Sequence, residues 1–144
     1  MQQLDETKIG YNMPTVFHLS EWLDYPRLER AFARMIAEDT SLRTTFHIED
    51  GWVIARVSPG TEFRMQWMEC GTIEEAMASF VRPFDLTEGP LLRAAMLKLP
   101  GNEPYLLLDM HHIISDGLSS QLLLGRLNQY YQELPVSMPE LDYI

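Results

Sequence analysis

Residues 105–117 read YLLLDMHHIISDG, and this stretch decides how the rest of the chain can be arranged. Its first six residues are mostly apolar and contain no strand breaker, which predicts a buried β-strand. Side chains alternate along a strand, so His111 and His112 should point to opposite faces for as long as the strand persists. One face is then expected to carry Leu106, Leu108, Met110 and His112, and the other Leu107, Asp109 and His111.

The polar residues that end this strand have chemical capabilities that apolar strand residues lack. Ligand sites in open sheets lie beyond the carboxyl ends of the strands, where His112 and Asp116 stand. An imidazole titrates at about pH 6.5, so His112 can take up a proton and return it. Asp116 could orient a histidine, or it could cap the turn before Gly117 and the helix that follows. Both histidines could equally be satisfied strand-end residues, and the residues alone leave these alternatives open.

Short strands and amphipathic helices alternate along the remaining chain. Asp24 followed by Pro26 indicates a helix start, and Thr72 with Glu75 forms a capping-box pattern before a second helix. A third helix is expected after Gly117. The predicted strands are residues 15–20, 42–48, 52–57, 63–68, 91–99 and 105–110. This order predicts an α/β fold in which helices cover a mostly antiparallel or mixed sheet.

Two turn signals join pairs of these strands into hairpins. The tripeptide at residues 49–51, Glu-Asp-Gly, separates the second strand from the third, and Asp-Gly between apolar alternations is a strong hairpin signal. Residues 100–102, Pro-Gly-Asn, separate the last two strands in the same way. Arg93 and Lys98, on the first strand of this second hairpin, are expected to face the solvent.

Composition limits the classes of function. A chain of 144 residues has the size of one ordinary domain, and a domain of this size can bury a core. The formal net charge of -10 disfavours nucleic acid and anionic membranes as partners. The single cysteine, Cys70, cannot form an internal disulfide and fits a reducing compartment. We find neither a signal-peptide pattern nor an apolar run that could span a bilayer, so we expect a cytoplasmic protein.

The complete string at residues 111–117, HHIISDG, resembles the His-His-x-x-x-Asp-Gly signature of condensation domains in nonribosomal peptide synthetases. Further segments match the family in the same order: YNMP at residues 11–14, LRTTF at 42–46, PFDL at 83–86 and GPLLR at 89–93. The resemblance therefore covers nearly the whole chain. The chain departs from the family at residues 38–40, where Glu-Asp-Thr stands in place of the usual Arg-His-Glu, and it lacks the expected Ser-x-Ala-Gln segment before Tyr11.

The resemblance implies a fold and an activity. Residues 1–144 would form the N-terminal lobe of a chloramphenicol-acetyltransferase-like fold, and nothing after Ile144 supplies the second lobe. Complete condensation domains form an amide bond when an amine on one carrier-protein arm attacks the thioester on another. We therefore expect an acyltransferase-type enzyme as part of a larger synthetase, and an isolated lobe that is inactive or nearly so.

The resemblance also implies roles for individual residues. His112 would be the general base or would position the amine, with His111 and Asp116 supporting the loop and the Gly117 amide near the developing oxyanion. Arg43 would pair with Asp116 and hold this loop. No cofactor is expected, because the substrates arrive on the phosphopantetheine arms of carrier proteins. Metal binding by the histidines is disfavoured because adjacent strand residues diverge.

Expected partners are the carrier-protein domains, the second lobe of the same domain, and further copies of this chain that meet through its exposed lobe-facing surface. Three other functions stay open. An epimerization domain shares the double histidine and isomerises an aminoacyl thioester. A coenzyme A-dependent acyltransferase shares the His-x-x-x-Asp core and uses a soluble donor, and a carrier-binding module would not be an enzyme at all.

Overall fold

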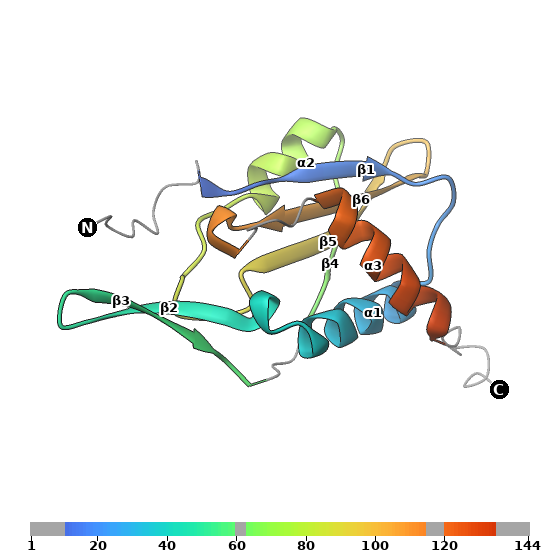
Figure 1. Ribbon diagram of the computed structural model, residues 1–144. Coiled ribbons are helices and arrows are strands. Elements are labelled where there is room, and N and C mark those ends of the chain that lie inside the picture. The colour runs from blue at the N-terminus through green and yellow to red at the C-terminus, as the bar shows by residue number, and fades with distance from the viewer. Residues whose placement is uncertain (1–10, 60–62, 115–119, 135–144) are drawn as a thin grey trace.

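A four-stranded mixed sheet forms the centre of the computed structural model, which describes residues 11–59, 63–114 and 120–134. The strands are β1 (Thr15–His18), β4 (Gln66–Glu69), β5 (Leu92–Leu99) and β6 (Glu103–Met110), in the spatial order β1-β6-β5-β4 (Figure 1). Strand β6 is antiparallel to both of its neighbours, whereas β4 runs parallel to β5. The expected α/β fold with a mixed sheet is therefore confirmed.

Helices cover both faces of this sheet (Figure 1). Helices α1 (Tyr25–Glu38) and α3 (Ser120–Glu133) pack on one face, and α2 (Ile73–Phe80) packs on the other. The alternation along β5 and β6 explains this arrangement, because successive side chains enter different cores. The core beneath α1 and α3 receives Ala94, Met96, Leu106, Leu108 and Met110. The core beneath α2 receives Ala95, Leu97 and Leu107.

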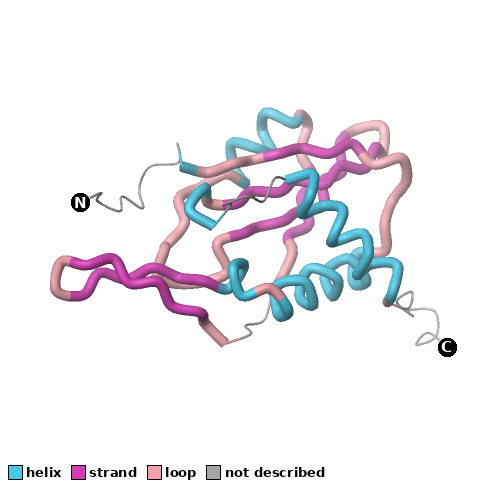
Figure 2. The backbone as a smooth tube through the Cα atoms, in the orientation of Figure 1, coloured by secondary structure: helices cyan, strands magenta, loops and turns pink. Residues whose placement is uncertain are grey.

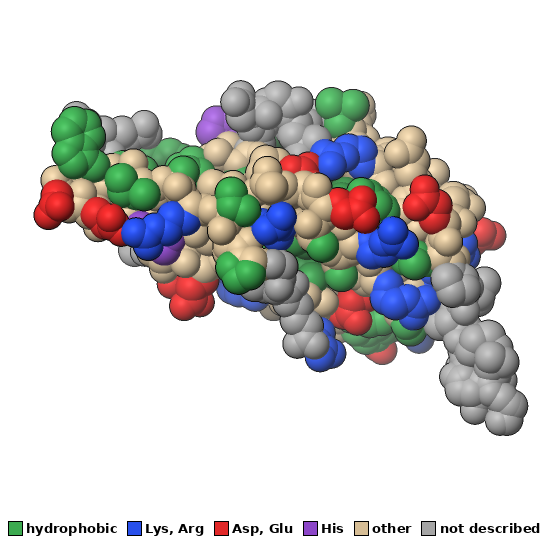
Figure 3. All heavy atoms as spheres, turned by 60° about the horizontal axis from the view of Figure 1, so that its bottom comes forward, with side chains coloured by type: hydrophobic (Ala, Val, Ile, Leu, Met, Phe, Trp, Pro, Cys, Tyr) green, Lys and Arg blue, Asp and Glu red, His purple; other side chains and the backbone are tan. Residues whose placement is uncertain are grey.

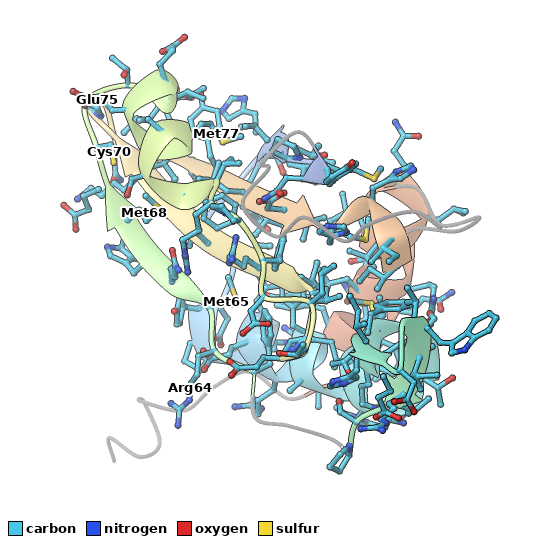
Figure 4. All side chains as sticks on the ribbon, turned by 90° about the vertical axis from the view of Figure 1, so that its left-hand side faces the viewer. Arg64, Met65, Met68, Cys70, Glu75 and Met77 are labelled. Atoms are coloured by element: carbon cyan, nitrogen blue, oxygen red, sulfur yellow. The ribbon has the colours of Figure 1, made fainter. Side chains whose placement is uncertain are left out.

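The smaller core is completed by side chains from the edge strand and from α2. Met68 of β4, Cys70 just beyond it, and Met77 of α2 pack against it as half-buried residues (Figure 4). Strand β4 is shorter than predicted, since residues 63–65 are not part of a strand. Sequence reasoning about hairpins had no signal for the parallel pairing of β4 with β5, which the intervening helix α2 makes sterically feasible.

The predicted helix starts are confirmed by their caps. The Asp24 carboxylate accepts the N–H of Arg27 at 3.3 Å, and the Thr72 hydroxyl accepts the N–H of Glu75 at 3.1 Å. A cap of this kind contributes about 1 kcal/mol. The capping box differs from the standard one in its return bond, because Glu75 accepts the N–H of Gly71 at 2.9 Å.

Strands β2 (Thr44–Glu49) and β3 (Trp52–Val57) form a separate two-stranded antiparallel sheet that projects from the body (Figure 2). Asp50 and Gly51 have φ values of 53° and 80°, as a tight hairpin turn requires. The 3-10 turn η2 (Thr40–Arg43) precedes β2 and replaces the predicted first residues of that strand. Large apolar side chains remain exposed on this hairpin, namely Ile48, Trp52, Val53 and Val57. Figure 3 shows hydrophobic atoms at the projecting end of the molecule.

Residues 38–40, where the sequence departs from the family it resembles, make contacts that join two helices. Asp39 caps η2 through Ser41 and forms an ion pair with Arg126 of α3 at 2.7 Å. Burial alone raises the pKa of the Asp39 carboxyl, but hydrogen bonds from Ser41 and Arg126 outweigh it and lower that pKa. Glu38 accepts the Tyr130 hydroxyl at 2.8 Å. These contacts join the end of α1 to α3.

Candidate active site at the end of β6

The two histidines lie where β6 leaves the sheet. The strand ends at Met110, His111 forms an isolated bridge with Asn12, and His112 begins the 3-10 turn η3 (His112–Ile114). The alternation predicted within the strand is confirmed, since Leu107 and Leu108 enter different cores. Because the strand ends before His112, that residue no longer follows the alternation and is carried by a turn instead.

His111 is a buried residue with defined partners. Only 6% of its surface is exposed, and its Nδ1 accepts the N–H of Ile113 at 3.0 Å. A neutral imidazole that accepts at Nδ1 carries its proton on Nε2. Burial, followed by the charge of His112, lowers the pKa of His111. The Tyr11 ring lies 5.9 Å from the His111 ring and the Phe84 ring lies 6.1 Å away, edge to face. His111 is therefore held neutral and oriented from several sides.

His112 differs from His111 in its access to solvent. Its side chain is exposed on η3, directly beside the buried His111. The turn is fixed by two bonds to His111, namely the Ile113 N–H to its Nδ1 and the Ile114 N–H to its carbonyl oxygen at 3.2 Å. An accessible imidazole on a turn of fixed geometry can orient a substrate group or exchange a proton with it.

Asp116 and Gly117 lie outside the described residues, so their expected roles stay predictions. The same holds for the expected pair between Arg43 and Asp116. Arg43 itself is half-buried and donates from Nε to the Ile36 carbonyl at 3.1 Å and from Nη1 to the Ser58 carbonyl at 2.6 Å. It ties the end of α1 to the residue that follows β3.

A buried polar network beside the histidines was missed by sequence reasoning. Asp109 is completely buried, and its Oδ2 accepts the Asn12 Nδ2–H at 2.7 Å and lies 3.8 Å from the Arg93 Nη1. Asn12 also donates to the Arg82 carbonyl at 2.9 Å. Arg93 donates to the carbonyls of Arg82 and Pro83 at 2.7 and 2.8 Å.

The network corrects the expectation that Arg93 faces the solvent. Its side chain is only 16% exposed, and its guanidinium lies 3.8 Å from the centre of the Phe84 ring. Burial, followed by the charge of Arg82, lowers the pKa of Arg93 to about 10, although Asp109 opposes this shift. Burial raises the pKa of Asp109 despite the bond from Asn12 and the charge of Arg93. One signal was available, because Asp109 shares its strand face with His111.

The histidines do not line the apolar groove beside α3. That groove, of about 720 Å³, lies between the segment leading into α1 and the side of α3, and its lining includes Leu19, Trp22, Leu23, Leu124, Leu127 and Tyr131. Within the ranges given above, no three His, Cys, Asp or Glu side chains come together as metal ligands. In the same part of the chain, no helix is both long enough and apolar enough to cross a bilayer.

Two synthases are similar in sequence to nearly the whole chain. Gramicidin S synthase 2 of Brevibacillus brevis is 39% identical over 143 residues, which cover 98% of this chain and 3% of that protein. Tyrocidine synthase 2 of Brevibacillus parabrevis is 37% identical over 145 residues, which cover 99% of this chain and 4% of that protein. The chain thus corresponds to a small part of each synthase.

Solved structures share the fold. The epimerization domain from the third module of tyrocidine synthetase B superimposes with a TM-score of 0.74 at 21% identity, covering 90% of this chain and 33% of that one. The first condensation domain of the calcium-dependent antibiotic synthetase gives 0.75 at 21% identity, covering 92% of this chain and 35% of that one. These matches confirm the expected chloramphenicol-acetyltransferase-like fold, of which the chain spans about a third of each structure. The family model for the condensation domain matches residues 1–141, and the chain belongs to the condensation-domain family.

Proposed function

We propose that this chain is the histidine-bearing lobe of a condensation domain that forms amide bonds between carrier-bound substrates. One observation carries the proposal: an exposed His112 directly follows a buried, neutral His111 at the end of β6. Membership of the condensation-domain family supports it, and residues 111–117 resemble the His-His-x-x-x-Asp-Gly signature of that family. The relatives named above are synthases of gramicidin S and tyrocidine, which agrees with peptide-bond formation.

In the proposed reaction, the amine nitrogen of the acceptor attacks the carbonyl carbon of the donor thioester. The carbon–nitrogen bond forms, the carbon–sulfur bond breaks, and the proton lost by nitrogen ends on the departing thiol. His112 would either carry that proton or orient the amine for attack. His111 would keep the turn in place, since its Nδ1 already holds the Ile113 N–H.

The expected roles of the neighbouring loop residues are part of the same proposal. Asp116 would support the histidine turn through Arg43, and the Gly117 amide would stabilise the oxyanion of the tetrahedral intermediate. Arg43 is suitably half-buried for such a pair, although its Nε and Nη1 already donate to backbone carbonyls.

The proposal includes specific partners. Carrier-protein domains would deliver both substrates on phosphopantetheine arms, and the lobe would need the second lobe of its domain for activity. Without that lobe, copies of this chain would meet through apolar side chains that stay exposed. We also propose a cytoplasmic location. The single cysteine cannot form an internal disulfide, and this fits a reducing compartment.

Epimerization is the competing function within the same fold. The epimerization and condensation domains named above superimpose on this chain almost equally well, with TM-scores of 0.74 and 0.75. Fold similarity therefore does not separate the two reactions. They differ in substrates, because epimerization uses one carrier-bound aminoacyl group and condensation uses two.

The decisive experiment compares wild type with His112→Ala in this chain combined with the remainder of a condensation domain. Both carrier proteins are loaded and the dipeptidyl thioester is measured by mass spectrometry. His18→Ala is a matched control, since His18 is an exposed histidine on β1 that pairs with Glu103. We expect product from wild type and His18→Ala and a loss of product from His112→Ala. Equal product from all three would remove His112 from the mechanism, and epimerization with no condensation would replace the proposed reaction.

A further inference from the structure

We propose that Asn12, Asp109 and Arg93 are positioning residues for the histidine turn. In this view the buried network fixes the ring of His111, and His111 in turn fixes where His112 meets the substrate. The functional part rests on the proposed function of His112. The structural part concerns only this chain and can be tested without any activity.

The network joins segments that are distant in sequence. Asn12 precedes β1, Asp109 lies near the end of β6, and Arg93 lies near the start of β5. All three converge on one place, where the Asp109 carboxylate contacts both partners and where Asn12 and Arg93 both donate to the Arg82 carbonyl. Asn12 is also the backbone bridge partner of His111. The network is therefore directly continuous with the end of the strand that carries the histidines.

The network also sets the two aromatic rings that flank His111. Tyr11 is the chain neighbour of Asn12, and its ring lies 5.9 Å from the His111 ring. Phe84 lies under the Arg93 guanidinium at 3.8 Å and forms a T-shaped contact with the His111 ring. The bonds from Arg93 to the Arg82 and Pro83 carbonyls hold the segment that leads into Phe84. Loss of the network would therefore free both rings that confine His111.

Movement of His111 would pass directly to His112. The Nδ1 atom and the carbonyl oxygen of His111 accept the N–H groups of Ile113 and Ile114, and these two bonds define the turn η3. His112 is the first residue of that turn. A tilt of the His111 ring breaks the bond to Ile113 and lets the turn open.

The energetics favour a positioning role over a purely stabilising one. A buried ion pair loses about as much by desolvation as it gains by attraction, so apolar residues of the same volume often stabilise a fold equally well. Two buried oxygens of the network, Asn12 Oδ1 and Asp109 Oδ1, have no hydrogen-bond partner among the residues that the structure describes. The network supplies directed hydrogen bonds, which apolar packing does not. These bonds fix the orientation of the groups that they join.

The test separates orientation from stability by a double substitution, Asp109→Leu with Arg93→Met, in this chain. The apolar pair fills similar volume, so we expect a melting temperature within about 5 °C of wild type. We also expect the His111 ring ¹⁵N shifts to lose the pattern of a fixed Nε2–H tautomer and the Ile113 amide to exchange about tenfold faster. Asp109→Asn keeps the shape of the side chain, and it replaces the double variant in these measurements if the double variant does not fold.

Arg126→Gln is the matched control, because it removes an ion pair of α3 that does not involve the histidine turn. It should leave the His111 shifts and Ile113 exchange as in wild type. If the folded double variant keeps the His111 shifts and the Ile113 exchange of wild type, the proposal is wrong. This holds whether or not the domain catalyses the proposed reaction. In a complete condensation domain the same variant should lower kcat about tenfold or more with a smaller change in KM. Full activity of His112→Ala would separately show that the proposed catalytic role of His112 is wrong.

Discussion

Replacing His111 with alanine tests whether this residue is the structural member of the histidine pair. The substitution removes the bond from the Ile113 N–H at 3.0 Å, which contributes about 1 kcal/mol. It also removes ring contacts with Tyr11 and Phe84, each contributing about 0.5–1 kcal/mol. We therefore expect the free energy of unfolding at pH 7 to fall by roughly 2–3 kcal/mol. The melting temperature should fall by roughly 5–10 °C.

The pH dependence of this loss gives a sharper test. Burial lowers the pKa of His111 in the folded chain, so below about pH 6.5 the unfolded chain binds a proton that the folded chain does not. Wild type therefore loses stability as the pH falls from about 6.5 toward the lowered pKa of His111. His111→Ala lacks this contribution, so the stability difference between the two proteins should shrink on acidification. Titrating groups that do not interact with His111 cancel in the comparison.

Thermal unfolding followed by circular dichroism at pH 7 and pH 5 supplies the measurement. His18→Ala is the control, because His18 is exposed and pairs with a similarly exposed Glu103 at 2.7 Å. Exposed pairs contribute about 0–1 kcal/mol. A His111→Ala protein as stable as wild type, or one whose deficit grows at pH 5, would refute the assignment of His111 as a buried neutral support.

Two further predictions concern the core and the hairpin. Leu127→Ala should destabilise the chain by about 2–5 kcal/mol in chemical denaturation, because Leu127 is 2% exposed between α3 and the sheet. Leu122→Ala on the same helix should change stability by less than about 0.5 kcal/mol, since Leu122 is 57% exposed, and equal effects would contradict the packing of α3. Ile48→Lys with Val53→Lys should abolish self-association measured by sedimentation, because both apolar side chains are exposed and paired on one face of the hairpin. Unchanged association would place the contact elsewhere.

Regular elements were predictable because local chemistry determines them. The alternation of β6 follows from its apolar residues, and the caps at Asp24 and Thr72 follow from side chains that accept backbone N–H groups. The hairpin turn at Asp50 and Gly51 follows from their tolerance of positive φ. In each case the residues that decide the structure are neighbours in sequence.

The missed features depend on contacts between distant residues. Arg93 reads as a solvent-facing charge on a strand, and only its position over Phe84 and next to Asp109 shows why it is buried. The parallel edge strand β4 depends on how α2 crosses the sheet, for which the local sequence carries no signal. The end of β6 at Met110 was predicted, but the exposure of His112 depends on the turn η3 that follows the strand.

The order of the strands also has a consequence for synthesis on the ribosome. Strand β5 pairs with β6 through a short turn, whereas β1 pairs with β6 across most of the chain, as in Val16 opposite Leu107. Closing so long a loop is slower than forming a hairpin. We therefore expect β1 to wait, unpaired, until the C-terminal third of the chain has been made. Since Asn12 reaches His111 only when β1 docks, we expect the histidine turn to become complete only after β1 has paired with β6.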